Sequence, residues 1–172
     1  MNFLLKPIQF LLIPLFAIMA CNQSGLTNGE DSALKKNLVE QEIEGINYKI
    51  ALPKGYQIIE RRGIDFSVYY FSPVDTTDMN SFRGGFYIGN AGGGFGPESS
   101  TCKTSFISSA LLGISEKWSV YNCNGKQKIE TITKSKTGIS WAGMIHAFGS
   151  ANSNEDLTKL LEVYSTLNVK SK

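Results

Sequence analysis

The first twenty residues differ sharply in composition from the rest of the chain, and their role decides where a folded domain can begin. Residues 7–20 are almost entirely apolar, Lys6 is the only charge before Cys21, and polar residues begin directly after that cysteine. A cation, an apolar run of about a dozen residues and a small residue at its end are the parts of a secretory signal. A membrane span needs roughly 18 uninterrupted apolar residues, and Pro14 interrupts this run. We therefore expect residues 1–20 to be a signal peptide.

The residues around the expected cleavage point resemble the lipobox of bacterial lipoprotein signals. They read Ile18-Met-Ala-Cys21, with Ile18 where Leu is most common. The resemblance implies cleavage before Cys21 by signal peptidase II, a diacylglycerol on its sulfur, and an acyl chain such as palmitate on its amine. Asn22 stands where lipoproteins retained in the inner membrane often carry Asp. We thus expect a lipid-anchored envelope protein, on the outer membrane and facing the periplasm, with plain secretion or a membrane anchor as alternatives.

Two cysteines remain once Cys21 is assigned to the lipid. Cys102 and Cys123 are an even pair in an oxidising compartment, and both have polar neighbours in the sequence. We expect a disulfide between them, and the alternative is two reduced, buried thiols.

Charge and composition exclude some classes of partner. The formal net charge of the chain is +2, which gives no electrostatic footprint for nucleic acid. Basic residues do not cluster into a polybasic membrane patch. Contact with the membrane is therefore expected through the N-terminal lipid alone.

The chain after Cys21 divides into a tether and one domain. Residues 21–45 are polar and glycine-punctuated and are expected to be the lipidated N-terminus and tether, with a short helix or disorder over 32–43. Residues 46–169 are expected to be the globular part. Runs of strand formers or alternating residues predict strands, and Asn124-Gly125 is the preferred pair for a two-residue hairpin turn. The predicted strands cover residues 48–52, 56–60, 66–71, 82–90, 118–123, 126–133 and 139–148.

Two helices are expected to pack on these strands. Phe106, Ala110 and Ile114 belong to an apolar set at helical spacing that predicts a helix over about 102–114. Leu157 to Leu167 form a second apolar stripe, with Ser153 and Asp156 placed as a capping box. The expected fold class is therefore α+β, a mainly antiparallel sheet with two packed helices.

The order of these elements resembles the PsbP-like superfamily. The resemblance depends on Tyr48-Lys-Ile-Ala-Leu-Pro-Lys-Gly-Tyr56 and on the closing helix at Leu157 to Leu167, with Tyr56 where Trp is more usual. It implies a PsbP-like fold and a binding or accessory module, because members of that superfamily mostly lack catalytic machinery. No functional residue is carried over.

Most catalytic and cofactor chemistry lacks its residues here. His146 is the only histidine, and neither a Gly-x-Ser-x-Gly elbow nor a zinc-type Cys-x-x-Cys is present. The run from Gly89 to Pro97 is rich in glycine, but no Gly-Lys-Ser/Thr follows it at phosphate-loop spacing. We expect no enzyme, cofactor or metal, and interpret His146 as a structural residue in a strand.

The function expected from these features is binding of a protein partner in the envelope, as an immunity lipoprotein or an accessory subunit. Exposed glycines and aromatic residues are typical of such surfaces. The alternatives are a carrier of a small apolar ligand in a cavity between sheet and helices, and an enzyme with polar groups converging around His146. The residues expected to contact a partner are Gly93, Gly94, Phe95, Tyr69 and Trp118.

Overall fold

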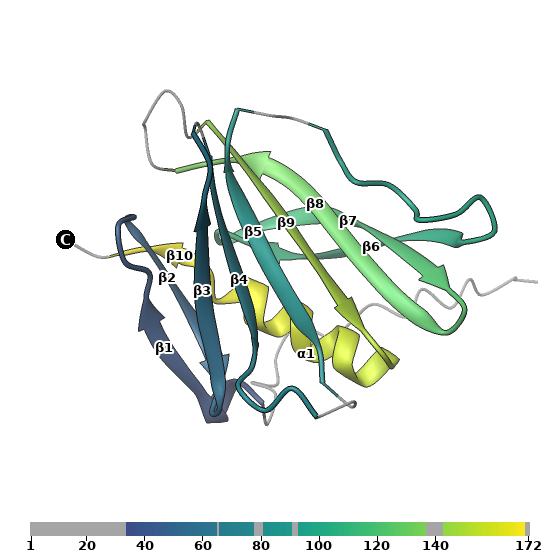
Figure 1. The fold of residues 1–172 in the computed structure, drawn as a ribbon, viewed down its shortest axis with the longest axis horizontal. Helices are drawn as coiled ribbons and strands as arrows, with labels where there is room; N and C mark the ends of the chain where they lie inside the picture. The colour runs from purple at the N-terminus through teal and green to yellow at the C-terminus, as the bar shows by residue number, and fades with distance from the viewer. Residues whose placement is uncertain (1–33, 65, 78–80, 91–92, 137–142, 171–172) are drawn as a thin grey trace, which may run out of the picture. The chain divides into compact units, whose positions relative to one another are not determined.

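A computed structural model describes residues 34–64, 66–77, 81–90, 93–136 and 143–170 (Figure 1). Within these ranges the chain forms ten β-strands, one α-helix and one short 3-10 helix. Their bounds are η1 (Lys35–Asn37), β1 (Leu38–Glu42), β2 (Tyr48–Pro53), β3 (Tyr56–Arg62), β4 (Ser67–Pro73), β5 (Arg83–Gly89), β6 (Lys103–Leu111), β7 (Ile114–Cys123), β8 (Lys126–Lys134), β9 (Met144–Ala151), α1 (Asn154–Ser165) and β10 (Asn168–Val169).

The strands form two antiparallel sheets. Seven strands are ordered β3-β4-β5-β9-β8-β7-β6, and β1, β2 and β10 form a smaller three-stranded sheet. The predicted Asn124-Gly125 hairpin joins β7 and β8, and both turn residues have positive φ angles, 54° and 81°. Asn and Gly adopt such angles at low cost, which explains why the pair directs a tight hairpin here.

The C-terminal helix α1 lies across one face of the seven-stranded sheet (Figure 1) and packs against β6 and β9. Its predicted cap is confirmed, because the backbone N–H of Asp156 donates to the Ser153 hydroxyl at 3.0 Å. Leu160 and Tyr164 of the predicted stripe are fully buried. We call the sheet face toward α1 the inner face and the opposite one the outer face.

The hydroxyl of Tyr164 joins α1 to two central strands. It accepts a hydrogen bond from the N–H of Gly85 on β5 at 2.9 Å, and lies within donating distance of the carbonyls of Gly85 and of Phe148 on β9. A side chain at Gly84 would lie 2.8 Å from the hydroxyl oxygen of Tyr164 on α1. Glycine at this position therefore lets the helix approach the sheet closely.

The expected fold class with two packed helices is wrong, because residues 103–111 form strand β6 and not a helix. All nine residues of β6 pair with β7, from Lys103 opposite Asn122 to Leu111 opposite Ile114. Thr, Ser, Phe and Ile dominate the segment, and these residues fit a pleated strand better than a helix. Leu112 and Gly113 have φ angles of 54° and 75° and form a hairpin turn within the segment expected to be helical.

The folded part also begins earlier than residue 46. Leu38–Glu42 form β1 beside β2, and Ile43 is 2% exposed in the core. These residues belong to the segment expected to be a tether. Residues 139–142 of the expected strand 139–148 lie outside the described residues, and β9 begins at Met144.

Candidate functional site

The alternation of side chains along β9 separates the two faces of the large sheet. Ile145 and Ala147 are fully buried in the core, and a side chain at Gly149 would lie 2.7 Å from Leu160 of α1. Successive strand residues point to opposite faces. His146 and Phe148 therefore project from the outer face, away from the helix.

Glu130 on β8 holds the glycine-rich loop against this outer face. Its carboxylate accepts hydrogen bonds from the backbone N–H of Phe95 at 2.7 Å and of Gly96 at 2.9 Å. The hydroxyl of Tyr121 on β7 also donates to it at 2.7 Å, and Nε2 of His146 lies 2.7 Å away. Glu130 is 6% exposed, so this network is a buried anchor for the loop.

The hydrogen bonds keep this buried carboxylate ionised. Burial alone would raise the pKa of Glu130, but the donors Tyr121, Phe95, Gly96 and His146 outweigh burial and hold the pKa below its ordinary value. An ionised carboxylate only accepts hydrogen bonds, so Nε2 of His146 carries a proton in this pair.

The anchored loop places Phe95 on the outer face as an exposed ring. Its centroid lies 4.5 Å from that of His146 and 5.2 Å from that of Phe148. Phe148 in turn contacts Tyr70 of β4 at 5.9 Å. The side chain of Phe95 is still 69% exposed and that of Tyr70 is 43% exposed. We call Tyr70, Phe95, His146 and Phe148 the aromatic surface.

Basic residues surround the aromatic surface. Among the described strand residues that project from the outer face, the only acid is the buried Glu130. Strands β3, β5, β7 and β8 each carry at least one basic residue whose side chain projects from this face. These residues are Arg61, Arg83, Lys117, Lys126, Lys128 and Lys134.

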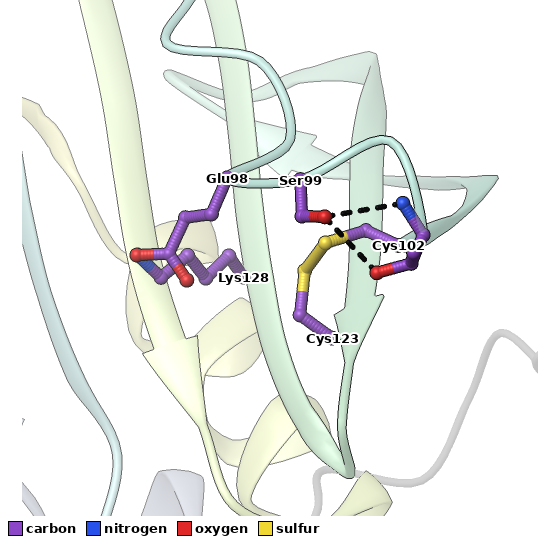
Figure 2. The surroundings of a disulfide bond; sticks show 6 residues. Glu98, Ser99, Cys102, Cys123 and Lys128 are labelled. Carbon is purple, nitrogen blue, oxygen red and sulfur yellow. Dashed lines mark hydrogen bonds and ion pairs between the residues drawn. A yellow bond between two sulfur atoms is a disulfide. The ribbon is translucent and has the colours of Figure 1, made fainter.

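An open hollow of about 350 Å³ lies beside Phe95 and is lined by Tyr121, Phe148 and Lys128 among others. The side chain of Glu98, further along the loop, forms an ion pair with Lys128 (Figure 2). This hollow opens on the outer face, whereas the ligand cavity considered from the sequence would lie between the sheet and the helix.

The predicted disulfide between Cys102 and Cys123 is confirmed. It joins the end of the glycine-rich loop to the end of β7, with a Cα–Cα distance of 4.5 Å, and a turn closed by the N–H of Cys102 on the carbonyl of Ser99 precedes it (Figure 2). The loop is thus held at two places, by Glu130 near Phe95 and by the disulfide at its end.

The five residues expected to contact a partner lie in two different environments. Gly93, Gly94 and Phe95 are exposed together on the loop. Tyr69 is 2% exposed and Trp118 is fully buried, and both point to the inner face and belong to the core. Their strands were identified from the sequence, but the face that each side chain occupies was not.

Sequence reasoning missed Glu130 and Tyr121. Glu130 lies within a predicted strand between the apolar residues Ile129 and Ile132. An acid flanked by apolar strand residues is seldom buried unless it is paired. That signal could have singled out Glu130, but two of its partners, the N–H groups of Phe95 and Gly96, come from a loop 35 and 34 residues away in the sequence.

Cys21 lies outside the described residues. No helix in the described part of the chain has both the length and the apolar character to cross a membrane. Searches of protein-family models, of curated proteins and of solved structures found no match to this chain.

Proposed function

We propose that this chain is a lipid-anchored protein of the cell envelope that binds a protein partner through its aromatic surface and performs no catalysis. The observation that carries the proposal is the exposed ring of Phe95, held on the outer face by backbone hydrogen bonds to the buried Glu130. Exposed aromatic residues that are fixed before binding contribute most to protein interfaces, because little conformational freedom is lost on association.

The arrangement around Phe95 supports a binding role. A side chain at Gly94 would lie 3.0 Å from Oε1 of Glu130, so a residue without a side chain lets the loop approach the carboxylate. Gly96 has a φ angle of 69°, which glycine adopts at low cost. These two glycines thus allow the loop conformation that presents Phe95.

The charges of the outer face indicate the chemistry of the partner. Basic side chains lie around the aromatic surface, and the one acid among the described strand residues of this face is buried and hydrogen-bonded. Glu98 on the loop is paired with Lys128, so the other basic residues carry the charge of this face. A complementary partner carries an apolar pocket for Phe95, surrounded by acidic residues. Such charges increase the association rate and make binding weaker at high salt.

The cellular location rests on the N-terminal sequence. Residues 1–20 followed by Cys21 support cleavage and acylation in the bacterial envelope, and a disulfide is typical of an oxidising compartment. Metabolic labelling with palmitate tests this part. The native chain is expected to be labelled, and a Cys21→Ser variant that was labelled equally well would refute the lipid anchor.

Affinity capture with matched variants tests the binding surface. The tagged protein is recovered from detergent-solubilised envelopes as the native chain, as Phe95→Ser and as Phe106→Ser. Phe106 is also an exposed aromatic residue of the outer face, 57% exposed, but it contacts Lys117 on β7 and lies outside the aromatic surface. A specific partner should be lost with Phe95→Ser and retained with Phe106→Ser, and should be eluted by salt. Equal recovery with both variants would refute the role of Phe95.

One observation favours a catalytic function as the second candidate. Glu130, His146 and Tyr121 converge within hydrogen-bond distance, as the groups of an acid–base site do. Against this candidate, both carboxylate oxygens already accept two hydrogen bonds each, and His146 is 3% exposed beneath Phe95. A turnover that His146→Gln abolished while the loop stayed in place would favour the enzyme.

A further inference from the structure

Strand β6 is the last strand of the seven-stranded sheet, and its far edge is unpaired within the described part of the chain. It pairs with β7 over nine residues, and no other described strand pairs with it. Eight of its nine residues, from Lys103 to Ala110, are exposed or half-buried. The backbone N–H and C=O groups on its far side are therefore open to another strand.

The turn before β7 determines which backbone groups these are. Leu112 and Gly113 form a two-residue turn with positive φ angles, closed by the pair Leu111 and Ile114. Such a turn is closed by a pair that exchanges both hydrogen bonds, and the bonding direction then alternates along an antiparallel strand. The odd-numbered residues of β6 thus bond to β7. Thr104, Phe106, Ser108 and Ala110 direct their N–H and C=O groups to the free edge.

The two edges of this sheet differ in how they are protected. The opposite edge, β3, carries Glu60, Arg61 and Arg62 within seven residues. From Thr104 to Leu111, β6 carries no charge and no proline. Charges and prolines are the usual devices that prevent an edge strand from pairing with another chain. Only β6 lacks them.

We propose that β6 pairs antiparallel with β6 of a second copy of this chain, so that two sheets join into one across a two-fold axis. The full overlap of nine residues is reached when Ile107 lies opposite Ile107 of the second copy. In this register Phe106 lies opposite Ser108, Thr104 opposite Ala110, and Lys103 opposite Leu111. No like charges face each other, and large side chains lie opposite small ones.

The backbone of β6 suits this occupant. The four outward residues of each copy fall into pairs in this register, and pairs that exchange two hydrogen bonds each give about eight bonds between the copies. The charged edge β3 stays free in such a pair, so that the assembly closes as a dimer instead of growing as a fibre. The proposal does not depend on the lipid anchor or on the partner of Phe95.

Cysteine substitution tests the register in membranes. Opposite residues that do not exchange hydrogen bonds have Cα atoms about 4.5 Å apart in an antiparallel pair, within the range of a disulfide. Ile107→Cys is therefore expected to form a covalent dimer on mild oxidation. Ile59→Cys is the matched control, since Ile59 is 40% exposed on the other edge strand, and should form no covalent dimer. Equal cross-linking of the two variants would overturn the proposal.

Sedimentation equilibrium of the intact protein in density-matched detergent tests the dimer itself. The native chain is expected to approach twice the mass of one chain. Ser108→Pro removes an outward N–H and leaves the bonds to β7 intact, and is expected to raise the dimer dissociation constant tenfold or more, as judged from about two lost hydrogen bonds. A native chain that is monomeric at every concentration, or that binds only a different protein along β6, would overturn the proposal.

Discussion

The hydrogen bonds of Glu130 predict how Glu130→Gln changes the glycine-rich loop. Oε1 accepts from the N–H of Gly96 and from Tyr121, and Oε2 accepts from the N–H of Phe95 and faces His146. The amide nitrogen of glutamine must occupy one of these two places. Tyr121 and His146 can rearrange to accept from it, but a backbone N–H cannot. At least one of the two loop N–H groups therefore loses its acceptor. The other then donates to a neutral amide oxygen in place of a charged carboxylate oxygen.

The size of the effect follows from these bonds. Hydrogen bonds to charged groups contribute about 1.5–3 kcal/mol each. A loss of about 2 kcal/mol in the free energy of loop opening corresponds to about 30-fold faster amide exchange. Hydrogen exchange followed by NMR at neutral pH measures this at the amides of Phe95 and Gly96. The amide of Ala147 on the central strand β9 should keep its protection.

Glu98→Gln is the matched control for this prediction. Glu98 lies on the same loop and loses an exposed ion pair with Lys128, which is 41% exposed, and such pairs contribute at most about 1 kcal/mol. Exchange at Phe95 and Gly96 should therefore change far less than in Glu130→Gln. If both variants left the two amides equally protected, the anchoring role of Glu130 would be refuted.

The pH dependence of the loop has a definite sign. The pKa of Glu130 is lowered in the folded protein from an ordinary value of 4.5. A lowered pKa means that the stabilisation is fully present above the ordinary value and is lost as pH falls through the folded value. Protection factors at Phe95 and Gly96 should therefore decrease as the pH falls below 4.5 and through the lowered pKa of Glu130, and should show no such step in Glu130→Gln.

Three further variants test the fold and the loop. Tyr164→Phe leaves the buried N–H of Gly85 without its acceptor and should lower the free energy of unfolding in urea by about 2 kcal/mol; a change near zero would contradict the hydroxyl's role. Gly96→Ala places a side chain at a φ of 69°, should cost about 1 kcal/mol, and should increase amide exchange in the loop, whereas unchanged exchange would show that the loop tolerates another conformation. Replacing Cys102 and Cys123 together by Ser should cost about 3 kcal/mol in thermal unfolding, and an unchanged melting temperature would show that the β6–β7 pairing alone closes this loop.

The elements that the sequence predicted correctly are those controlled by a few adjacent residues. Asn124-Gly125 directs its own turn, and Ser153 with Asp156 caps α1, so both elements follow from a few adjacent residues. The disulfide also followed from counting cysteines and from the expected compartment. In each case the controlling residues are adjacent or the chemistry allows few alternatives.

Residues 103–111 show why other elements could not be predicted. Phe106, Ala110 and Ile114 are spaced as on a helix, yet Phe106 and Ala110 pair with β7 as strand residues, and Ile114 begins β7. A helical period in a short segment does not exclude a strand whose two faces are both partly apolar. The site was missed for a related reason, because Glu130 meets Phe95 and His146 only after distant segments have come together.

Photo-cross-linking in intact cells tests the central claim most directly. A benzophenone amino acid replaces Phe95 in one variant and Phe106 in another, so that an aromatic group is kept at both positions of the outer face. We expect position 95 to give one discrete covalent product with an acidic partner protein, and the yield of this product should fall at high salt in envelope preparations. Position 106 should give no product of that mass. The same product from both positions, or products with lipid alone, would contradict the claim.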